Sequence, residues 1–546
     1  MIQVIKKEKK WIVVYLAFSL LLTAIRLINP ILISNFFDNA DTSDVHYLLK
    51  IVIVILVASI VTGFLNIFCS ILDTKVRNKI VRKAKKEYLE KLLNMDFEIL
   101  EKIDFGDKKL RYDLNGVYGE LAISFIANTI IEIFTCVFIF VYLFTINHIM
   151  TVVFVLCLLI NSFLEYQIGK KSYKFSKEVT EIQSVGETKV TNALRNIAYI
   201  KTNNCANVIV DDIDFIQMDL SKKQEQHTKE IASIDNLNLQ IYKVIEVVIF
   251  AVAAFMLKNE TITVGQIYLF INYMGWIDNA FSTIWNNYIK YRSSKAKIDT
   301  INSTFVGIVK QPITNYNVFD SREHIKTLTI DNVGFKYVPG EFELNKMNMK
   351  LEKGDFVAIV GESGCGKSTF MKLISGLYHP REGSILYNDF DITSSSPEQR
   401  ASKLAYVSQN IAIMDGTLYD IVDFLNLGVS SEQIDKALEL ANLHGFVDSL
   451  KDGVNTHISE SGINLSGGQL QRLAVAQAMV YDKEVYIFDE ITSGLDDITQ
   501  NKLIDNLKTI STDKIMIFVT HRLNTLNQFN KVFEFKNGTM NQIDKK

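Results

Sequence analysis

Six long apolar runs before residue 305 limit the fold of this chain more than any other feature. A helix needs about 20 mostly apolar residues to cross the hydrocarbon core of a bilayer. Each run has that length, so the sequence predicts six membrane-spanning helices. They cover residues 11–33, 51–72, 121–145, 149–169, 237–257 and 264–289. The first run is too long for a cleaved signal peptide, and no small-residue cleavage site follows it.

Basic residues between the runs predict the orientation, because Lys and Arg collect on the cytoplasmic side of a membrane. Several lysines precede the first run, and the segments 75–111 and 170–229 are rich in Lys and Arg. We therefore expect both termini, both long segments and everything after the sixth span to be cytoplasmic, in a bacterial plasma membrane. Helical periodicity in both segments indicates that the spans continue beyond the membrane, with short turns near 94–106 and 203–212.

The chain changes character near residue 305, where short strand and helix patterns replace the apolar runs. We expect a membrane domain at 1–305, a linker at 306–325 and a second domain at 326–546. A formal net charge of −3 gives no support for nucleic-acid binding. Five scattered cysteines form neither a disulfide framework nor a zinc site.

A glycine-rich loop after the expected strand 355–360 predicts a phosphate-binding site. Backbone N–H groups of such a loop close around phosphate oxygens at the start of a helix. Lys367 would neutralise the outer phosphates, and Ser368 would hold Mg²⁺. The loop, called the phosphate loop below, consists of Gly361, Glu362, Ser363, Gly364, Cys365, Gly366, Lys367, Ser368 and Thr369. Cys365 is either a reactive thiolate at the helix N-terminus or an inert small residue.

Two further sequence patterns in the same domain place polar residues at the end of a strand and at the start of a helix. The apolar strand 485–489 ends in Asp489 and Glu490, which would contact Mg²⁺ through water and polarise an attacking water. On its own, this pattern is equally that of an ordinary strand end. The segment 465–469 precedes a helix, and its Ser466 is a plausible N-cap that offers another helix N-terminus to an anion. A simple capped helix start is the alternative.

In this order, the six spans, the phosphate loop, Leu-Ser-Gly-Gly-Gln and the Asp-Glu strand resemble the ATP-binding-cassette (ABC) transporters, specifically exporter-type half-transporters. The resemblance implies a multidomain membrane protein: an all-α six-helix transmembrane domain and an α/β P-loop ATPase domain with a helical signature subdomain. It also implies ATP and Mg²⁺ as cofactors and an ATPase coupled to transport.

The resemblance further implies roles for single residues. Tyr337 would stack on adenine, and Gln409 would touch Mg²⁺ and sense the membrane domain. Catalysis would rest on Glu490, Lys367 and His521, with His521 contacting the γ-phosphate. The remaining positions are the signature that binds ATP on the opposite subunit, the dimer-contact loop and the acidic coupling loop: Ser466, Gly467, Gly468, Gln469, Asp496 and Glu460. Ser459, Gln477 and Gly494 depart from the family pattern, which puts the fine tuning of coupling in doubt.

A single cassette per chain implies a partner half-transporter, most simply a second copy in a homodimer with two equivalent ATP sites. The expected function is export of a peptide or an amphipathic small molecule by alternating access. The alternatives are an importer on the same scaffold, as in some siderophore systems, and a nucleotide-gated sensor or channel. Because ten residues precede the first span, we expect no cysteine-protease domain of the kind found in some peptide exporters.

Three acids inside the expected spans are candidates for a substrate cavity: Glu132, Glu246 and Asp278. A charge at mid-bilayer costs about 2.5–3.5 kcal/mol, so such acids usually face a cavity or a partner. An anionic cavity for a cationic substrate is one interpretation. The other is local pairing, since Lys243 and Glu246 are three residues apart and can share a helix face.

Overall fold

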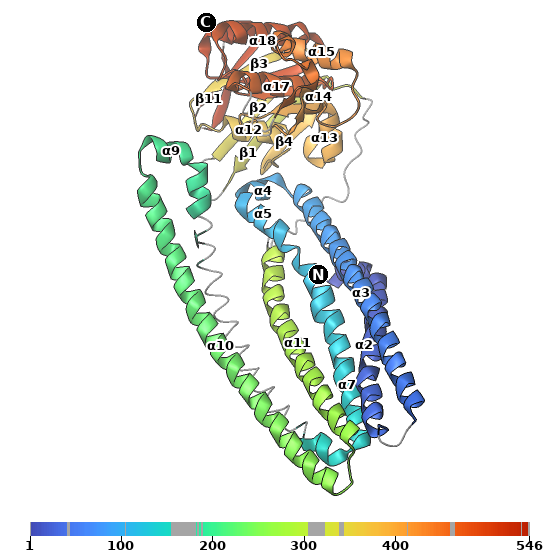
Figure 1. The fold of residues 1–546 in the computed structure, drawn as a ribbon. Coiled ribbons are helices and arrows are strands. Elements are labelled where there is room, and N and C mark those ends of the chain that lie inside the picture. Colours follow the sequence, from blue (N-terminus) through green and yellow to red (C-terminus); the bar gives the residue numbers. More distant parts are fainter. Residues whose placement is uncertain are drawn as a thin grey trace. The chain divides into compact units, whose positions relative to one another are not determined.

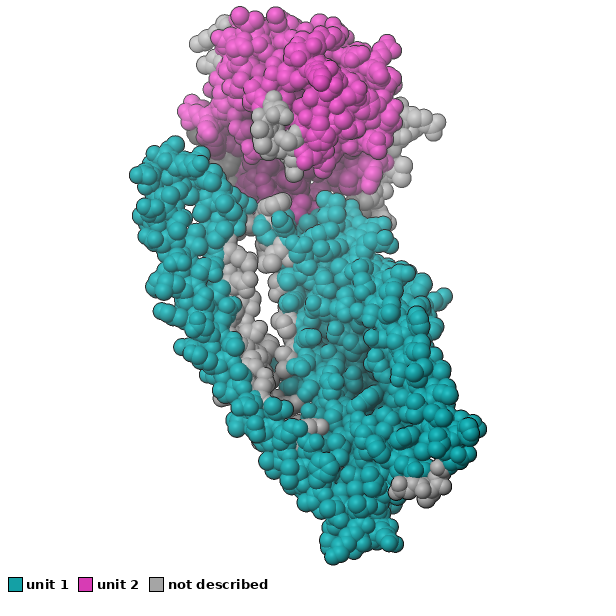
Figure 2. All heavy atoms as spheres, viewed as in Figure 1, with its two compact units in different colours: residues 1–94, 104–307 teal, residues 95–103, 308–546 magenta. Residues whose placement is uncertain are grey.

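The computed structural model describes residues 2–40, 44–103, 105–153, 155, 182, 185, 186, 189–303, 323–337, 343–411, 413–458, 465–536 and 538–543. The chain forms two compact units, 1–94 with 104–307 and 95–103 with 308–546 (Figure 2). The expected linker 306–325 lies almost entirely outside the described residues.

The first unit is helical throughout its described residues. Its helices are α1 Ile2–Lys7, α2 Lys9–Asp38, α3 Val45–Leu93, α5 Phe105–Leu114, α6 Val117–Glu120, η1 Leu121–Asn128, α7 Thr129–Ile146, α9 Ile197–Thr202, α10 Ala206–Lys258 and α11 Val264–Ser303. Within this unit α2, α3, α7 and α11 run alongside one another (Figure 1). Contacts of α11 with α2 and with α7 bring the first, third and sixth expected spans together.

Four described helical segments are long and apolar enough to cross a membrane: Lys9–Asp38, Val45–Leu93, Arg111–Ile146 and Leu239–Lys258. They contain the first, second and third expected spans and nearly all of the fifth. The sixth expected span lies inside α11, which is long but is not among these four. Most of the fourth span, 149–169, lies outside the described residues.

Two local details differ from the sequence-based expectation. The turn expected at 203–212 is confined to 203–205, because α10 begins at Ala206 and continues without a break to Lys258. The first eight residues of the third span form the π-helix η1 instead of an α-helix. Phe125 of this segment stacks on Tyr291 of α11 with ring centroids 4.2 Å apart. π-Helical turns are uncommon and concentrate at functional segments.

A single carboxylate joins the C-terminal end of α2 to the N-terminal end of α11. Asp38 Oδ1 accepts a hydrogen bond from the backbone N–H of Gly265 (2.8 Å), and Oδ2 accepts one from the Thr263 hydroxyl (2.9 Å). The two backbones approach so closely that a Cβ at Gly265 would lie 2.2 Å from the carbonyl oxygen of Ser34. Only glycine therefore fits at this position.

The second unit contains a six-stranded sheet in the order β12-β11-β3-β10-β9-β6, parallel except for the edge strand β12. Its strands are β3 Phe356–Gly361, β6 Leu404–Val407, β9 Val485–Asp489, β10 Ile515–Val519, β11 Lys531–Lys536 and β12 Thr539–Ile543. Every residue of β9 and β10 is buried, as expected for parallel strands covered on both faces. The carboxyl ends of β3, β9, β10 and β6 meet at one edge.

Two smaller sheets and several helices complete this unit. An antiparallel sheet has the order β2-β1-β4-β5, and β7 pairs with β8. These strands are β1 Thr327–Lys336, β2 Glu343–Glu352, β4 Glu382–Tyr387, β5 Phe390–Asp391, β7 Gly416–Thr417 and β8 His457–Ile458. The helices are α4 Phe97–Lys102, α12 Lys367–Ile374, α13 Pro397–Lys403, α14 Leu418–Val422, α15 Ser431–Leu440, α16 His444–Asp448, α17 Gly467–Met479 and α18 Asp497–Thr509, with short 3₁₀ turns at Ile392–Ser394, Gly453–Asn455, Ser511–Asp513 and Leu523–Gln528.

Helix α4 belongs to the second unit, although it follows α3 directly in the chain. Glu98 accepts two hydrogen bonds from Arg381 Nη2 (2.8 and 2.9 Å), and Glu101 accepts one from Lys372 Nζ (2.7 Å). Glu101 also accepts a hydrogen bond from the hydroxyl of Tyr378. The expected turn at 94–106 is therefore a short helix that is fixed by its acids to the body of the second unit.

Reversing one charge of the Glu98–Arg381 pair is expected to lower severalfold the ATPase activity that the family resemblance implies, measured on the membrane-reconstituted chain. Arg381→Glu places two acids side by side, whereas the native pair, with Arg381 41% exposed, contributes about 0.2–1 kcal/mol. The double swap Glu98→Arg/Arg381→Glu should recover most of the activity, measured as phosphate release. Lys350→Glu on the exposed side of β2 is the matched control. If the double swap were no better than the single variant, this pair would not fix α4.

Candidate active site

The phosphate loop leads from β3 into α12, as the sequence predicts. Gly366 caps the helix with φ = +107°, a left-handed conformation that favours glycine. A Cβ at Gly361 would lie 2.5 Å from the carbonyl oxygen of Phe535. These two glycines allow the chain to turn tightly against β11 and to direct the helix N-terminus toward the loop.

Lys367 is 5% exposed and lies inside the phosphate loop. Its Nζ donates hydrogen bonds to the carbonyl oxygens of Gly361 (2.8 Å) and Glu362 (2.7 Å). Among the residues that the structure describes, no carboxylate lies within ion-pair distance of this ammonium group. A buried positive charge beside a helix N-terminus gives this loop the chemistry to bind an anion. Cys365 Sγ lies 3.8 Å from the same nitrogen, and its reactivity stays a prediction.

Tyr337 directly follows β1 and contacts the end of the phosphate loop. Its hydroxyl is hydrogen-bonded to the Thr369 hydroxyl (2.9 Å). Its ring packs edge-on against Phe335 and Tyr378, with centroids 5.1 and 5.8 Å apart. This position places an aromatic ring beside the expected nucleotide, and stacking on adenine stays a prediction.

Asp489 lies at the carboxyl end of β9 and is only 2% exposed. Its Oδ1 is buried without a hydrogen-bond partner among the described residues, and its Oδ2 accepts a long hydrogen bond from the Tyr406 hydroxyl (3.4 Å). Burial and the neighbouring charge of Glu490 raise the pKa of Asp489. A hydrogen bond from Ser368 and the charge of Lys367 lower this pKa and so offset part of the rise.

This donor set fits Mg²⁺. A buried carboxylate oxygen without a partner normally requires an explanation such as a bound ion or water. Mg²⁺ takes oxygen ligands and is usually held by one or two protein oxygens together with substrate phosphates. Ser368 and Asp489 provide such oxygens at the base of the phosphate loop, where both were predicted to act.

Glu490 is held from both sides by the two other predicted polar residues. Gln409 Nε2 donates to its Oε2 (2.8 Å), and His521 Nε2 lies 2.7 Å from its Oε1. The three residues follow β6, β9 and β10, which are neighbours in the sheet. Glu490 itself has φ = +53°, a strained conformation for a non-glycine residue that is typical of functional sites. The sequence motifs identified these three residues, but their spacing did not predict that Gln409 and His521 both contact Glu490.

The signature segment forms the predicted capped helix. Ser466 Oγ accepts from the N–H of Gln469 (3.2 Å), and the Gln469 side chain accepts from the N–H of Ser466 (2.8 Å). A Cβ at Gly468 would lie 2.9 Å from the Leu495 side chain, so glycine permits close packing on the loop 493–496. Asp496 caps α18 through both its oxygens. Binding of ATP in trans stays a prediction, and Glu460 lies outside the described residues.

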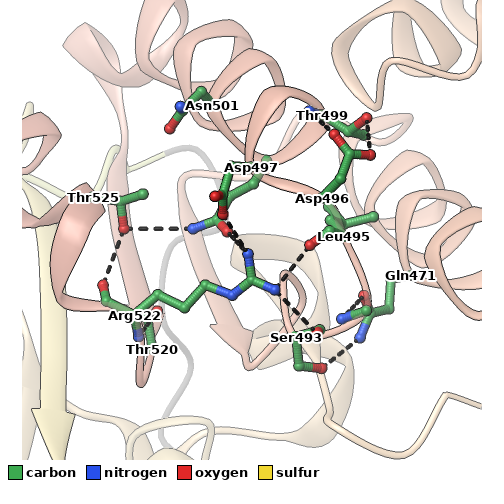
Figure 3. Close-up of polar contacts among 12 residues, drawn as sticks. Gln471, Ser493, Leu495, Asp496, Asp497, Thr499, Asn501, Thr520, Arg522 and Thr525 are labelled. Carbon is green, nitrogen blue, oxygen red and sulfur yellow. Dashed lines mark hydrogen bonds and ion pairs between the residues drawn. The ribbon is translucent and has the colours of Figure 1, made fainter.

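Two residues that sequence reasoning missed hold the loop 493–496 (Figure 3). Gln471 of α17 donates from Nε2 to the Ser493 hydroxyl (2.8 Å) and accepts from the N–H of Gly494 (3.0 Å). An added Cβ at Gly494 would lie 3.0 Å from the Gln471 oxygen. The departure from alanine at position 494 therefore gives the Gln471 side chain room to approach the loop.

Arg522 is the second residue, and it comes from the turn after β10 (Figure 3). Its Nη2 donates to the carbonyl oxygens of Leu495 (2.8 Å) and Ser493 (3.3 Å). Its Nη1 donates to Gln500 (2.6 Å) and Asp497 (3.1 Å) of α18. Arg522 directly follows His521, and this adjacency was the only sequence signal that could have identified it. The Arg522 guanidinium group thus connects the turn that contains His521 to the loop 493–496, which is expected at the dimer contact.

Arg522→Lys is expected to lower kcat for ATP hydrolysis about tenfold and to leave KM for ATP within twofold. A lysine keeps the charge but cannot reproduce the forked geometry that contacts four oxygens. Steady-state phosphate release over an ATP series measures both constants. Lys502→Ala, an exposed change on α18 outside this network, is the control. A rise in KM with unchanged kcat would contradict a role in positioning the loop.

Among the described residues, the three membrane acids do not line one cavity together. Glu132 lines a cavity of about 500 Å³ in the first unit. Glu246 instead forms an ion pair with Lys243 (2.9 Å) one turn earlier in α10. Asp278 lies in α11 but is not among the residues that line the cavity. For Glu246 the local-pairing interpretation therefore holds.

Comparison with known proteins gives consistent similarities. A family model described as "ABC transporter" matches residues 344–493, and one described as "ABC transporter transmembrane region" matches residues 12–281. A putative export ATP-binding/permease protein of Rickettsia felis is 27% identical over 98% of this chain and 94% of its own length. The alpha-hemolysin translocation ATP-binding protein HlyB of Escherichia coli O157:H7 is 37% identical, over 39% of this chain and 30% of its own. The solved structure of a bacterial Atm1-family ABC exporter with ATP bound has a TM-score of 0.82 at 18% identity, over 97% of this chain and 94% of its own.

Proposed function

The chain belongs to the ABC transporters that carry a transmembrane region and an ATP-binding domain on one polypeptide, and from this membership we propose that it is an ATP-driven exporter. The proposal rests on the group of Lys367, Asp489 and Glu490 at one edge of the sheet. The other unit of the same chain contains apolar helices long enough to cross a membrane. The names of the similar proteins favour export over import. The proposed cargo is a peptide or an amphipathic small molecule.

The residues of the site perform separate parts of ATP hydrolysis in this proposal. The phosphate loop binds and orients the phosphates, and Lys367 stabilises their charge. Ser368 and Asp489 hold Mg²⁺, which supplies charge stabilisation when it is bound. Glu490 polarises the attacking water, and Gln409 and His521 hold its carboxylate in place. By its match to the family's histidine, His521 would also contact the terminal phosphate.

ABC exporters generally act as dimers, and we propose that this one is a homodimer. One chain contributes one phosphate loop and one signature, so two copies build two equivalent ATP sites. The loop 493–496, which Gln471 and Arg522 hold, would lie at the contact between the copies. We place both termini and the ATPase unit in the cytoplasm, because of the basic loops described above.

Flux in sealed vesicles tests the direction of transport. Inverted membrane vesicles that contain the full chain should accumulate cargo with ATP, and vesicles with Glu490→Gln should not. To identify the cargo, mass spectrometry compares culture media and cells of hosts that carry either form. A species absent from the mutant medium and retained in its cells would identify it. ATP-dependent movement out of inverted vesicles would instead favour an importer, and a phenotype unaffected by Glu490→Gln would favour a sensor.

A further inference from the structure

A polar cavity of about 500 Å³ lies among α2, α7 and α11 in the first unit. Its lining includes a base, an acid, three amides and an indole: Arg26, Glu132, Asn29, Asn272, Asn279 and Trp276. Ligand pockets for small molecules typically measure about 300–1,000 Å³. The volume therefore suits a small molecule or a short peptide segment, not a folded protein.

The charged groups lie deep in segments that are otherwise apolar. Arg26 is 12 residues before the end of α2, and Glu132 is 14 residues before the end of α7. At a rise of 1.5 Å per residue these positions are about 18 and 21 Å from those helix ends. Charges at such depth are costly and normally mark a substrate path or a partner.

Neither charge is neutralised by another residue in the part of the chain that the structure describes. Among the described residues, Glu132 has no hydrogen bond or ion pair. Arg26 donates one hydrogen bond, from Nη2 to the amide oxygen of Asn66 (3.1 Å), and no described carboxylate pairs with it. Asn29 Oδ1 is buried without a partner among these residues. By contrast, Glu246 in the same unit is neutralised by an ion pair with Lys243.

We propose that this cavity binds a zwitterionic ligand, with its ammonium group at Glu132 and its anionic group at Arg26. The Asn29 amide oxygen accepts a further hydrogen bond from the ligand, and Trp276 packs against its apolar part. Two opposite charges in one cavity select against molecules that carry only one of them, because the other protein charge would stay buried and unpaired. This inference rests on the proposed function in taking the bound molecule as the cargo, but binding itself requires no ATP.

The zwitterion can be a free peptide or the headgroup of an ethanolamine lipid, and one set of measurements distinguishes these sources. The full chain has three tryptophans. In a Trp11→Phe/Trp285→Phe background, reconstituted without nucleotide in nanodiscs of phosphatidylglycerol, which carries no ammonium group, Trp276 is the single reporter. The probes are trileucine with free termini, its N-acetylated form and its C-terminal amide. A second set of discs contains phosphatidylethanolamine and no peptide.

Trileucine should shift the Trp276 emission with a half-saturation at least tenfold lower than that of either blocked peptide. Glu132→Gln should remove the discrimination against the acetylated peptide, and Arg26→Gln the discrimination against the amide. Glu246→Gln, the paired acid, is the matched control and should leave all three curves unchanged. A peptide-independent shift in phosphatidylethanolamine discs that Glu132→Gln abolishes would identify a lipid headgroup as the ligand.

Equal binding of all three peptides, or no response to peptide and lipid alike, would overturn the proposal. Such a result leaves ATP-driven export untouched, because flux and ATP hydrolysis are measured separately. Conversely, loss of flux in Glu490→Gln vesicles with normal Trp276 titration would confirm the transport machinery and the cavity independently.

Discussion

Replacement of Glu490 by Gln is expected to leave ATP binding intact and to lower kcat for ATP hydrolysis by about 10²–10⁴, the usual contribution of a positioned general base. The amide has nearly the same shape, so the phosphate loop and Lys367 keep their arrangement. It cannot accept a proton, however, and it loses the charge that Gln409 and His521 contact in the native site.

Single-turnover phosphate release and equilibrium binding of labelled ATP test the two halves of this expectation separately. Glu432→Gln, an exposed acid in α15, provides the control for a change of one charge. Undiminished hydrolysis in the Glu490 variant would exclude this residue as the base. Loss of ATP binding together with turnover would show that the substitution disturbs the phosphate loop.

Lys367→Met is expected to weaken ATP binding at least 100-fold. The ammonium group is the one positive charge of the phosphate loop, and it is buried with backbone carbonyl oxygens as its hydrogen-bond acceptors among the described residues. Methionine keeps the chain length and removes the charge, so the loss is electrostatic. Fluorescence titration with a labelled ATP analogue measures the dissociation constant.

The same variant should not lower the melting temperature measured without nucleotide, because a buried charge without a carboxylate partner is itself costly. Lys436→Met on the exposed face of α15 is the matched control and should bind ATP normally. If Lys367→Met melted well below the parent protein, its binding defect would reflect misfolding. Unchanged affinity would remove Lys367 from phosphate recognition.

Local features of this chain could be predicted from its sequence because each depends on neighbouring residues. The run 356–360 reads as a buried strand, the glycines of the phosphate loop demand a turn, and Ser466 has the chemistry of an N-cap. The apolar runs predict membrane-length helices for the same reason. In each case the pattern of a few consecutive residues determines the element.

Contacts between distant residues could not be predicted in this way. Gln409 and Glu490 meet because β6 and β9 are neighbours, and their geometry also depends on the unusual backbone of Glu490. The role of Arg522 depends on four oxygens from the segment 493–500, none of which forms a motif with it. Likewise, the depth and charge of Glu132 and Glu246 are similar, and only the three-dimensional arrangement shows which one faces a cavity.

The contacts of Asp38 between α2 and α11 have a consequence for the cavity that Glu132 and Arg26 line. Two of the three cavity walls are joined at that end by two hydrogen bonds to one carboxylate and by the close approach at Gly265. Asp38 is exposed to solvent, so each of these bonds contributes about 0.5–1.5 kcal/mol. We therefore expect α2 and α11 to stay together at that end, and a bound molecule to leave along α7 and not between α2 and α11.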